Sequence, residues 1–234
     1  MGPEEKICAI ITGQGTGAAT GQLNQAKKLG ANAVELRMDL ITGSKETVET
    51  LIQKAHSLGL SCIVTYRDKE EGGKYEGTDK KRLVLDAISL GADFVDIELE
   101  HAGTIKAARA PAKKAGCGII ASWHDFGRQP ELLAMEKKIQ QAKDAGADIA
   151  KIAFVAEDDY EKTIDALSDC AEETGIAIIA SPMGRHATAG RAYALKKGSA
   201  FAYCTLDKDE SVAPGVPTVT KLVKKLKNQV DNNG

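Results

Sequence analysis

Short apolar runs alternate along the chain with longer segments in which apolar residues follow a helical spacing. The apolar runs are rich in Val, Ile, Ala and Phe and are continuous, which is typical of strands buried on both faces. Segments such as 22–29 and 137–145 show the helical pattern, and a glycine follows each of them. Glycine just beyond the last turn is the usual end of a helix. The glycines in such positions recur about every 30 residues: Gly30, Gly59, Gly91, Gly116, Gly146, Gly175 and Gly198.

The apolar runs predict eight strands, with helices in the gaps between them. The strands are expected at residues 7–12, 33–37, 61–66, 94–99, 118–122, 149–154, 176–180 and 200–205, and the last helix at 218–228. A strand–helix unit that repeats about every 30 residues indicates parallel βαβ connections. Eight such units predict an α/β fold, a single-domain (β/α)8 TIM barrel over residues 1–234. The alternative is an open doubly wound sheet. Against it, residues 12–17 lack the third glycine of a dinucleotide-binding fingerprint at the proper place, and no acidic residue ends the second strand.

Composition narrows the classes of function. Of the 234 residues, 43% are apolar and 27% are charged, which allows a large core, and the net charge is −2. This balance gives no support for a nucleic-acid or membrane-surface partner, and no apolar stretch approaches the ~20 residues that span a bilayer. Five isolated cysteines without a C-x-x-C pair argue against a zinc site or a disulfide framework. Since the N-terminus is also polar, we expect a cytoplasmic protein without a metal.

The sharpest chemical signal is a single lysine, Lys151, within the otherwise apolar run 147–156. Catalytic groups in (β/α)8 barrels lie at the carboxyl ends of the strands and on the loops that follow. Burial lowers the pKa of a lysine, and a neutral amine is a nucleophile that condenses with carbonyl compounds. The alternative is a structural ion pair of Lys151 with Asp96 or Glu98 inside the barrel.

A histidine and several arginines are expected at the same end of the barrel. His124 follows the strand next to that of Lys151, and its ordinary pKa near neutrality suits proton transfer. An imine on Lys151 would withdraw electrons and acidify the neighbouring C–H bond, while arginines would hold a carboxylate or phosphate. The other polar residues expected there are Glu35, Arg37, Arg67 and Glu71, with Arg185 and Arg191 in the loop after the seventh strand.

Several motifs, in this order and spacing, resemble the type I 3-dehydroquinate dehydratases of the shikimate pathway. They are Glu35-x-Arg37, Tyr66-Arg67 with Glu71-Gly72-Gly73, Ser122-Trp123-His124-Asp125-Phe126, Asp148-Ile149-Ala150-Lys151-Ile152-Ala153, Met183, Arg191 and Ala213-Pro214-Gly215. The resemblance covers roughly residues 7–225. It implies a hydro-lyase that converts 3-dehydroquinate to 3-dehydroshikimate in aromatic amino-acid biosynthesis. It also implies no cofactor, because the lysine imine with the substrate takes that place.

The same resemblance implies a role for each matching residue. Lys151 would form the Schiff base with the C3 ketone of the substrate. His124 would remove the C2 proton and later protonate the leaving C1 hydroxyl, and Glu71 would orient His124. The residues implied to bind substrate are Arg191 at the carboxylate, Glu35, Arg37 and Arg67 at the ring hydroxyls, and Met183 against the ring.

The chain departs from this family in its last loop, where the bacterial members have Ser-Ala-Pro-Gly-Gln. Aligned on Ala-Pro-Gly, Val212 and Val216 replace the serine and the glutamine, and Ser211 comes one residue too early. We expect this lid to close, with Ser211 and Val216 beside the substrate, but to contribute less binding energy. The alternative functions are a class I aldolase, which also uses a barrel lysine, and a non-catalytic barrel that binds a shikimate-like acid. We expect a homodimer that acts on a small molecule, without nucleic-acid or membrane partners.

Overall fold

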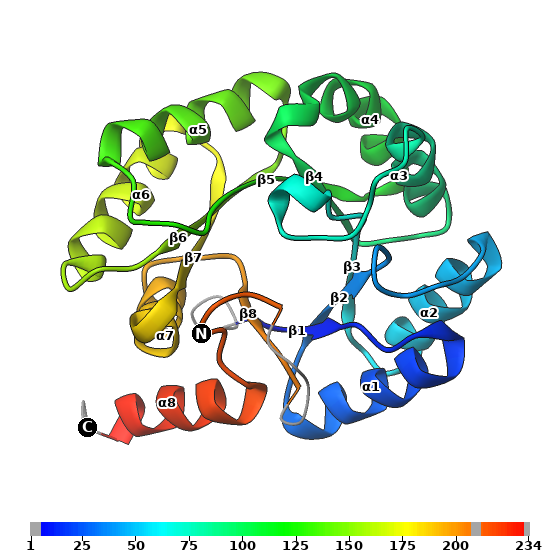
Figure 1. Ribbon diagram of the computed structural model, residues 1–234, viewed down its shortest axis with the longest axis horizontal. Coiled ribbons are helices and arrows are strands. Elements are labelled where there is room, and N and C mark those ends of the chain that lie inside the picture. Colours follow the sequence, from blue (N-terminus) through cyan, green and yellow to red (C-terminus); the bar gives the residue numbers. More distant parts are fainter. Residues whose placement is uncertain (1–5, 207–211, 232–234) are drawn as a thin grey trace.

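Strand and helix alternate eight times around a central barrel in the computed structural model, which describes residues 6–206 and 212–231 (Figure 1). The strands are β1 (Ile7–Ile11), β2 (Ala33–Arg37), β3 (Ser61–Thr65), β4 (Phe94–Glu98), β5 (Gly118–Asp125), β6 (Ile149–Val155), β7 (Ala177–Met183) and β8 (Ala202–Cys204). The helices are α1 (Gly15–Leu29), α2 (Lys45–Ser57), α3 (Lys80–Ser89), α4 (Ala102–Ala115), α5 (Leu132–Ala145), α6 (Tyr160–Thr174), α7 (Ala187–Lys196) and α8 (Val219–Asp231). The predicted single-domain (β/α)8 TIM barrel is confirmed.

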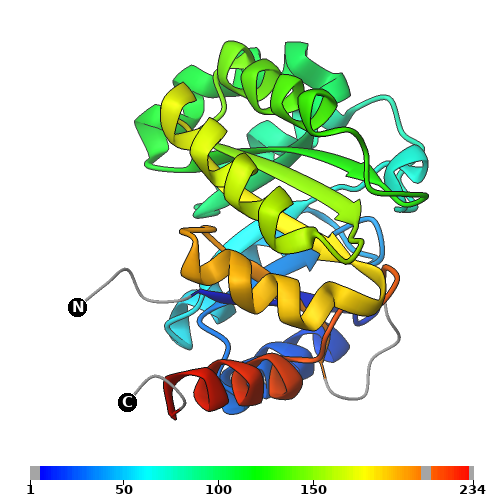
Figure 2. The ribbon, with the colours of Figure 1, turned by 90° about the vertical axis from the view of Figure 1, so that its left-hand side faces the viewer.

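The strands form one parallel sheet that curves into a nearly closed barrel. Their hydrogen-bonded order is β7-β6-β5-β4-β3-β2-β1-β8. At the seam between β7 and β8, the Ala200 N–H donates to the Ile178 carbonyl at 2.8 Å. The Ser199 hydroxyl accepts from the Ala180 N–H and donates to the Phe201 carbonyl, at 3.2 Å each. α8 packs against α7 and α1 outside this seam (Figures 1 and 2).

The helix ends agree with the glycine pattern, whereas some strand ends do not. All seven glycines expected to end helices have a positive φ, between 65° and 95°, which glycine adopts at little cost. β5 continues past residue 122 to Asp125, because its pairing with β6 extends to Asp125 opposite Phe154. β7 likewise runs to Met183, beyond the expected end at residue 180, since it pairs with β6 up to Val155. His124 and Met183 therefore lie within strands.

Inward-facing side chains change from apolar to polar along the strands. Side chains two residues apart point to the same face of a strand, so the change can be followed position by position. Inside the barrel lies an apolar cluster of Cys8, Ile10, Ala33, Ile63, Ile120, Ile149, Ile179, Phe201 and Tyr203. Two residues further along five of these strands come buried polar side chains: Glu35, Thr65, Ser122, Lys151 and Ser181. The apolar cluster thus supports a polar layer at the carboxyl end of the barrel.

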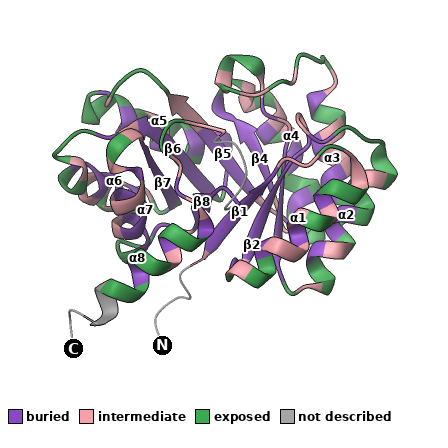
Figure 3. Cartoon of the chain, turned by 60° about the horizontal axis from the view of Figure 1, so that its bottom comes forward, coloured by how far each residue is buried: buried purple, intermediate pink, exposed green. Residues whose placement is uncertain are grey.

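A second and larger apolar core lies between the strands and the helices. Figure 3 shows the strands buried and the exposed residues gathered on the outer faces of the helices. Each helix therefore contributes one apolar face to the core, as its amphipathic pattern predicts. None of the described helices is long and apolar enough to cross a membrane.

Candidate active site

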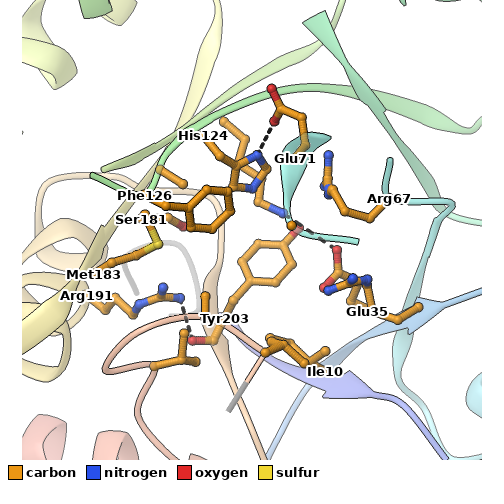
Figure 4. A pocket seen from close by; sticks show the side chains of 17 residues that line it. Ile10, Glu35, Arg67, Glu71, His124, Phe126, Ser181, Met183, Arg191 and Tyr203 are labelled. Carbon is orange, nitrogen blue, oxygen red and sulfur yellow. Dashed lines mark hydrogen bonds and ion pairs between the residues drawn. The ribbon is translucent and has the colours of Figure 1, made fainter. Parts of the chain in front are cut away.

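A pocket lies at the carboxyl ends of the strands, above the polar layer (Figure 4). The predicted site residues that line it are Glu35, Arg37, Arg67, Glu71, His124, Lys151, Met183, Arg191 and Val216. The remaining lining residues are Ile10, Gly72, Phe126, Ala153, Ser181, Tyr203, Val212 and Ala213. The other predicted site residue, Ser211, lies outside the described residues. Residues from both ends of the chain thus meet in one cavity.

Lys151 lies in the middle of β6 with only 5% of its surface exposed. Its Nζ donates to Asp96 Oδ2 at 2.9 Å and lies 3.6 Å from Glu35 Oε1. The same nitrogen is 3.9 Å from the ring centroid of Tyr203. The ion pair with Asp96 that the sequence left open is therefore present, whereas Glu98 pairs with other cations. Because Lys151 also lines the pocket, this pair holds the amine where a ligand can reach it.

Asp96 is held in place by two further side chains. It accepts hydrogen bonds on Oδ1 from Arg67 at 2.8 Å and from Ser122 at 2.6 Å. Burial opposes ionisation of this carboxyl, but Arg67 and Lys151 hold its pKa well below the usual range. Arg67 also lies 3.0 Å from Glu98 Oε1. A fixed and ionised Asp96 therefore determines the position of the Lys151 amine.

His124 and Glu71 form a second pair on the upper wall of the pocket. Nδ1 of His124 lies 2.5 Å from Glu71 Oε2, and Phe126 stacks on the imidazole with ring centroids 5.6 Å apart. Burial lowers the pKa of His124 well below its ordinary value, helped by the nearby charges of Arg67 and Lys151. Burial raises the pKa of Glu71 to about 7. Because Nδ1 is engaged by Glu71, Nε2 is the ring nitrogen left for proton transfer.

Arg191 projects from α7 and not from the loop after β7, so the expected position was wrong. The turn Gly184–His186 leads directly into α7 at Ala187, which leaves Arg191 one turn inside the helix. Its Nε donates to the Pro182 carbonyl at 3.1 Å and its Nη1 to the Tyr203 carbonyl at 2.7 Å.

The partners of Arg191 leave its charge uncompensated. Its surface is 3% exposed, and among the described residues no carboxylate pairs with it. Burial consequently lowers the pKa of the guanidinium. Arg185, by contrast, is exposed and pairs with Asp158 at 2.8 Å. A buried arginine that is held by neutral carbonyls has a charge that can bind an anion.

The opposite wall carries Glu35 and Arg37 on β2. Arg37 donates through Nε and Nη2 to the two carboxylate oxygens of Asp39, both at 2.8 Å. Glu35 accepts from the Thr65 hydroxyl at 2.9 Å. These contacts fix two charged side chains at the pocket surface, where they can bind hydroxyl groups of a ligand.

Residues 212–216, which follow β8 in the chain, cover the pocket with apolar side chains. Val212 and Val216 pack against the apolar cluster inside the barrel, and both line the pocket. The loop is anchored by the Gly184 N–H, which donates to the Pro214 carbonyl at 2.9 Å. Gly215 has a φ of +70°, and a Cβ there would lie 2.2 Å from the Gly184 carbonyl oxygen. The close approach of the two backbones therefore requires glycine.

Residues 7–232 match the family model for type I 3-dehydroquinase. The chain belongs to this family. It is 38% identical to the 3-dehydroquinate dehydratase of Methanosarcina barkeri over 215 residues, which cover 86% of this chain and 87% of that protein. It is 29% identical to the chloroplastic bifunctional 3-dehydroquinate dehydratase/shikimate dehydrogenase of Arabidopsis thaliana, but it spans only 36% of that protein's length.

Solved structures of the 3-dehydroquinase family share the barrel. The 3-dehydroquinate dehydratase of Aquifex aeolicus superposes with a TM-score of 0.79 and 28% identity, over 95% of this chain and 98% of that one. The enzyme of Geobacillus kaustophilus gives a TM-score of 0.85 at 23% identity, over 100% of this chain and 94% of that one. The second likeness is evidence for the fold alone.

Three pocket residues of this 3-dehydroquinase-family chain belong to none of the motifs or roles predicted from the sequence: Ile10, Ser181 and Tyr203. Side chains two residues apart on a strand point to the same face. This rule could have identified Ser181, which lies two residues before the predicted Met183 on β7. Tyr203 lies two residues after the inward-facing Phe201 and could have been found in the same way. Both were overlooked because a serine and a tyrosine within apolar runs give no charge signal.

Proposed function

We propose that this chain is a 3-dehydroquinate dehydratase that forms an imine with its substrate through Lys151. The observation that carries the proposal is the meeting of a buried lysine, a histidine–glutamate pair and an uncompensated arginine in one pocket. A lysine supplies the nucleophile, a histidine moves a proton, and an arginine binds a carboxylate. Because the chain belongs to the type I 3-dehydroquinase family, we infer that the substrate is 3-dehydroquinate. Its ketone would react with the lysine, its C2 proton would move to the histidine, and its carboxylate would bind the arginine.

In the proposed reaction, the Lys151 ammonium group first gives up one proton, and the neutral amine adds to the C3 ketone. A proton is taken up again as water leaves, so the product is the protonated imine with the same charge as the original ammonium group. The imine withdraws electrons from C2 and makes its proton acidic. His124 takes this proton on Nε2 and returns it to the C1 hydroxyl, which leaves as water when the C1–C2 double bond forms. Water then hydrolyses the imine, so that the net change is the loss of one water molecule from 3-dehydroquinate.

Substrate binding is proposed for residues on both sides of the amine. Arg191 would bind the carboxylate, while Glu35 and Arg37 would bind ring hydroxyls. Met183 would pack against the ring from the end of β7. Arg67 donates to Asp96 and Ser122 and lies 3.0 Å from Glu98, so we assign it mainly to positioning the carboxylate that holds Lys151.

We propose that the reaction needs no metal or organic cofactor. Asp68, Glu98 and His101 do place one possible ligand atom each within 4.8 Å of one another. However, Lys80 Nζ lies 2.6 Å from Asp68 Oδ1 and 2.5 Å from Glu98 Oε2. The ammonium group therefore already compensates the two carboxylates, which supports a structural role for this cluster.

We also propose the cellular compartment and the oligomeric state of the protein. All five cysteines are free thiols, and four of them are buried. This supports a reducing compartment, the cytoplasm. A homodimer remains our proposal for the assembly, and light scattering of the purified protein tests it.

The test of the proposed function is the absorbance of the conjugated enone product when the protein is mixed with 3-dehydroquinate. An aldolase or a non-catalytic binding protein would produce no such absorbance. Borohydride added during turnover should reduce the imine and attach one ligand to Lys151. A folded protein that gives neither signal would contradict the proposal.

A further inference from the structure

Two hydroxyl groups in the pocket have no hydrogen-bond partner among the described residues. They are Ser181 Oγ on β7 and Tyr203 Oη on β8. Each residue is 3% exposed, and both line the pocket. Leaving a buried hydroxyl without a partner costs free energy, so such groups in a folded protein call for an explanation.

The fold itself does not need these hydroxyls. Tyr203 is a member of the apolar cluster inside the barrel, where a phenylalanine would pack in the same way. Ser181 stands in register with Ala153 of β6, which also faces the pocket. Ser199 is an example of a serine whose hydroxyl stabilises the fold. It accepts a hydrogen bond from the Ala180 N–H and donates one to the Phe201 carbonyl, whereas the Ser181 hydroxyl has no such partner among the described residues.

Both hydroxyls lie beside groups to which we assign chemistry. The centroid of the Tyr203 ring lies 3.9 Å from Lys151 Nζ, and the Tyr203 side chain extends into the centre of the pocket (Figure 4). Burial raises the pKa of Tyr203 well above its ordinary value, so the phenol keeps its proton and can donate. Ser181 precedes Pro182, whose carbonyl accepts from Arg191, and thus lies next to the proposed carboxylate site.

We propose that Ser181 and Tyr203 are substrate-binding residues whose hydroxyls hydrogen-bond the bound substrate, Ser181 near its carboxylate and Tyr203 near the imine carbon. This inference rests on the proposed function and deepens it. It also accounts for the apolar lid. Val212 and Val216 cannot form hydrogen bonds through their side chains, and the barrel wall supplies these bonds in their place.

The test compares Tyr203→Phe and Ser181→Ala with the wild type in steady-state kinetics and thermal unfolding. Each variant should raise KM for 3-dehydroquinate about two- to tenfold, the loss of one neutral hydrogen bond, with a smaller change in kcat. Without ligand, each variant should unfold at the same or a higher temperature than the wild type, because an unpartnered buried hydroxyl is removed. The rise in Tm on adding 3-dehydroshikimate should be smaller in both variants.

Two matched controls separate binding from structure. Tyr193→Phe removes a hydroxyl that bonds Asp165 outside the pocket, and it should leave KM unchanged. Ser199→Ala removes a partnered buried hydroxyl, and it should lower Tm without changing KM.

Unchanged KM and an unchanged ligand-induced shift in Tm for both pocket variants would overturn the inference, while the proposed function would stand on wild-type turnover. The inference would also be overturned if the pocket variants lost stability as Ser199→Ala does, since the hydroxyls would then be structural. A wild type that forms no enone product would overturn the proposed function, and this inference with it.

Discussion

Lys151 is both a buried cation and the proposed nucleophile, and its partners explain how one residue can serve as both. Its amine is held by Asp96 and Glu35 and is still open to the pocket. The sequence predicted apolar surroundings from the run 147–156, because residues next to Lys151 in the chain are apolar. The two carboxylates come from β4 and β2. The sequence left the pair with Asp96 open as an alternative, but the contact with Glu35 was not predicted.

Lys151→Ala should abolish dehydration without unfolding the protein, because Arg67 still compensates Asp96 in the variant. Borohydride trapping with 3-dehydroquinate, followed by peptide mass mapping, should label only the peptide with Lys151 in the wild type. Lys80 is the internal control, since it is equally buried but pairs with Asp68 and Glu98 outside the pocket. Label on any other lysine would contradict the assignment.

The pH dependence of turnover should reflect the pair of His124 and Glu71. Above about pH 7 Glu71 is ionised and accepts the Nδ1–H of His124, which leaves Nε2 free to take a proton. Below this pH the pair holds one more proton. If His124 carries this proton, both ring nitrogens are protonated. If Glu71 carries it, Glu71 donates to Nδ1 and the one proton of the ring lies on Nε2. In both cases Nε2 cannot act as a base. We therefore expect kcat to fall as the pH drops through about 7.

Glu71→Gln should move this acid limb to lower pH, because His124 then titrates alone and burial lowers its pKa well below the ordinary value. At pH 8 the variant should also turn over more slowly, since an amide stabilises a protonated imidazole less than a carboxylate does. The profile of kcat against pH measures both effects. If the fall of kcat at low pH occurs at the same pH in the variant, it is caused by a group other than the pair of His124 and Glu71.

Arg191→Ala should raise KM for 3-dehydroquinate about tenfold or more, because a charge-assisted contact with the carboxylate is lost. Arg185→Ala is the matched control, as Arg185 is exposed and pairs with Asp158. It should leave KM near the wild-type value. The reverse order of effects would make Arg185 the carboxylate-binding residue.

At the scale of elements, the register of neighbouring strands decides which predictions succeeded. Continuous apolar runs located all eight strands, because strands covered on both faces need apolar side chains throughout. The ends of β5 and β7 depended on pairing with β6, which no local pattern encodes. The position of Arg191 was wrong for a similar reason, since α7 begins directly after a short turn. The charged residues of the pocket were predicted from the sequence, whereas the uncharged Ser181 and Tyr203 were not.

The loop that covers the pocket should depend on Gly215. Gly215→Ala would place a Cβ against the Gly184 carbonyl and push the loop away from β7, so KM should rise several-fold. Gly198→Ala is a suitable control, because Gly198 has a similar positive φ but no atom within 4 Å of the added Cβ. This control should lower Tm slightly and leave KM unchanged. Equal effects of the two substitutions on KM would exclude a special role for the loop contact.

At the scale of the whole molecule, the barrel is closed by few contacts between β7 and β8. Ser199 contributes one of these contacts, because its hydroxyl accepts from the Ala180 N–H of β7. The same hydroxyl donates to the Phe201 carbonyl on its own side of the seam. Ser199→Ala should therefore lower the free energy of unfolding by about 1–3 kcal/mol, since a buried N–H loses its partner. Urea unfolding measures the change. Ser89→Ala, which removes an exposed hydroxyl on α3, should have little effect and serves as the reference.

The buried ion pair between Lys151 and Asp96 has a consequence for the path of the reaction. A protonated imine carries the same single positive charge as the ammonium group from which it derives. Asp96 and Glu35 therefore face a cation both before the substrate arrives and after it is covalently attached. The interior of the barrel can keep its dipoles and side chains where they are while the covalent bond forms. Little reorganisation is then needed at the moment of chemistry, which is the condition under which a fixed charged environment lowers a barrier most.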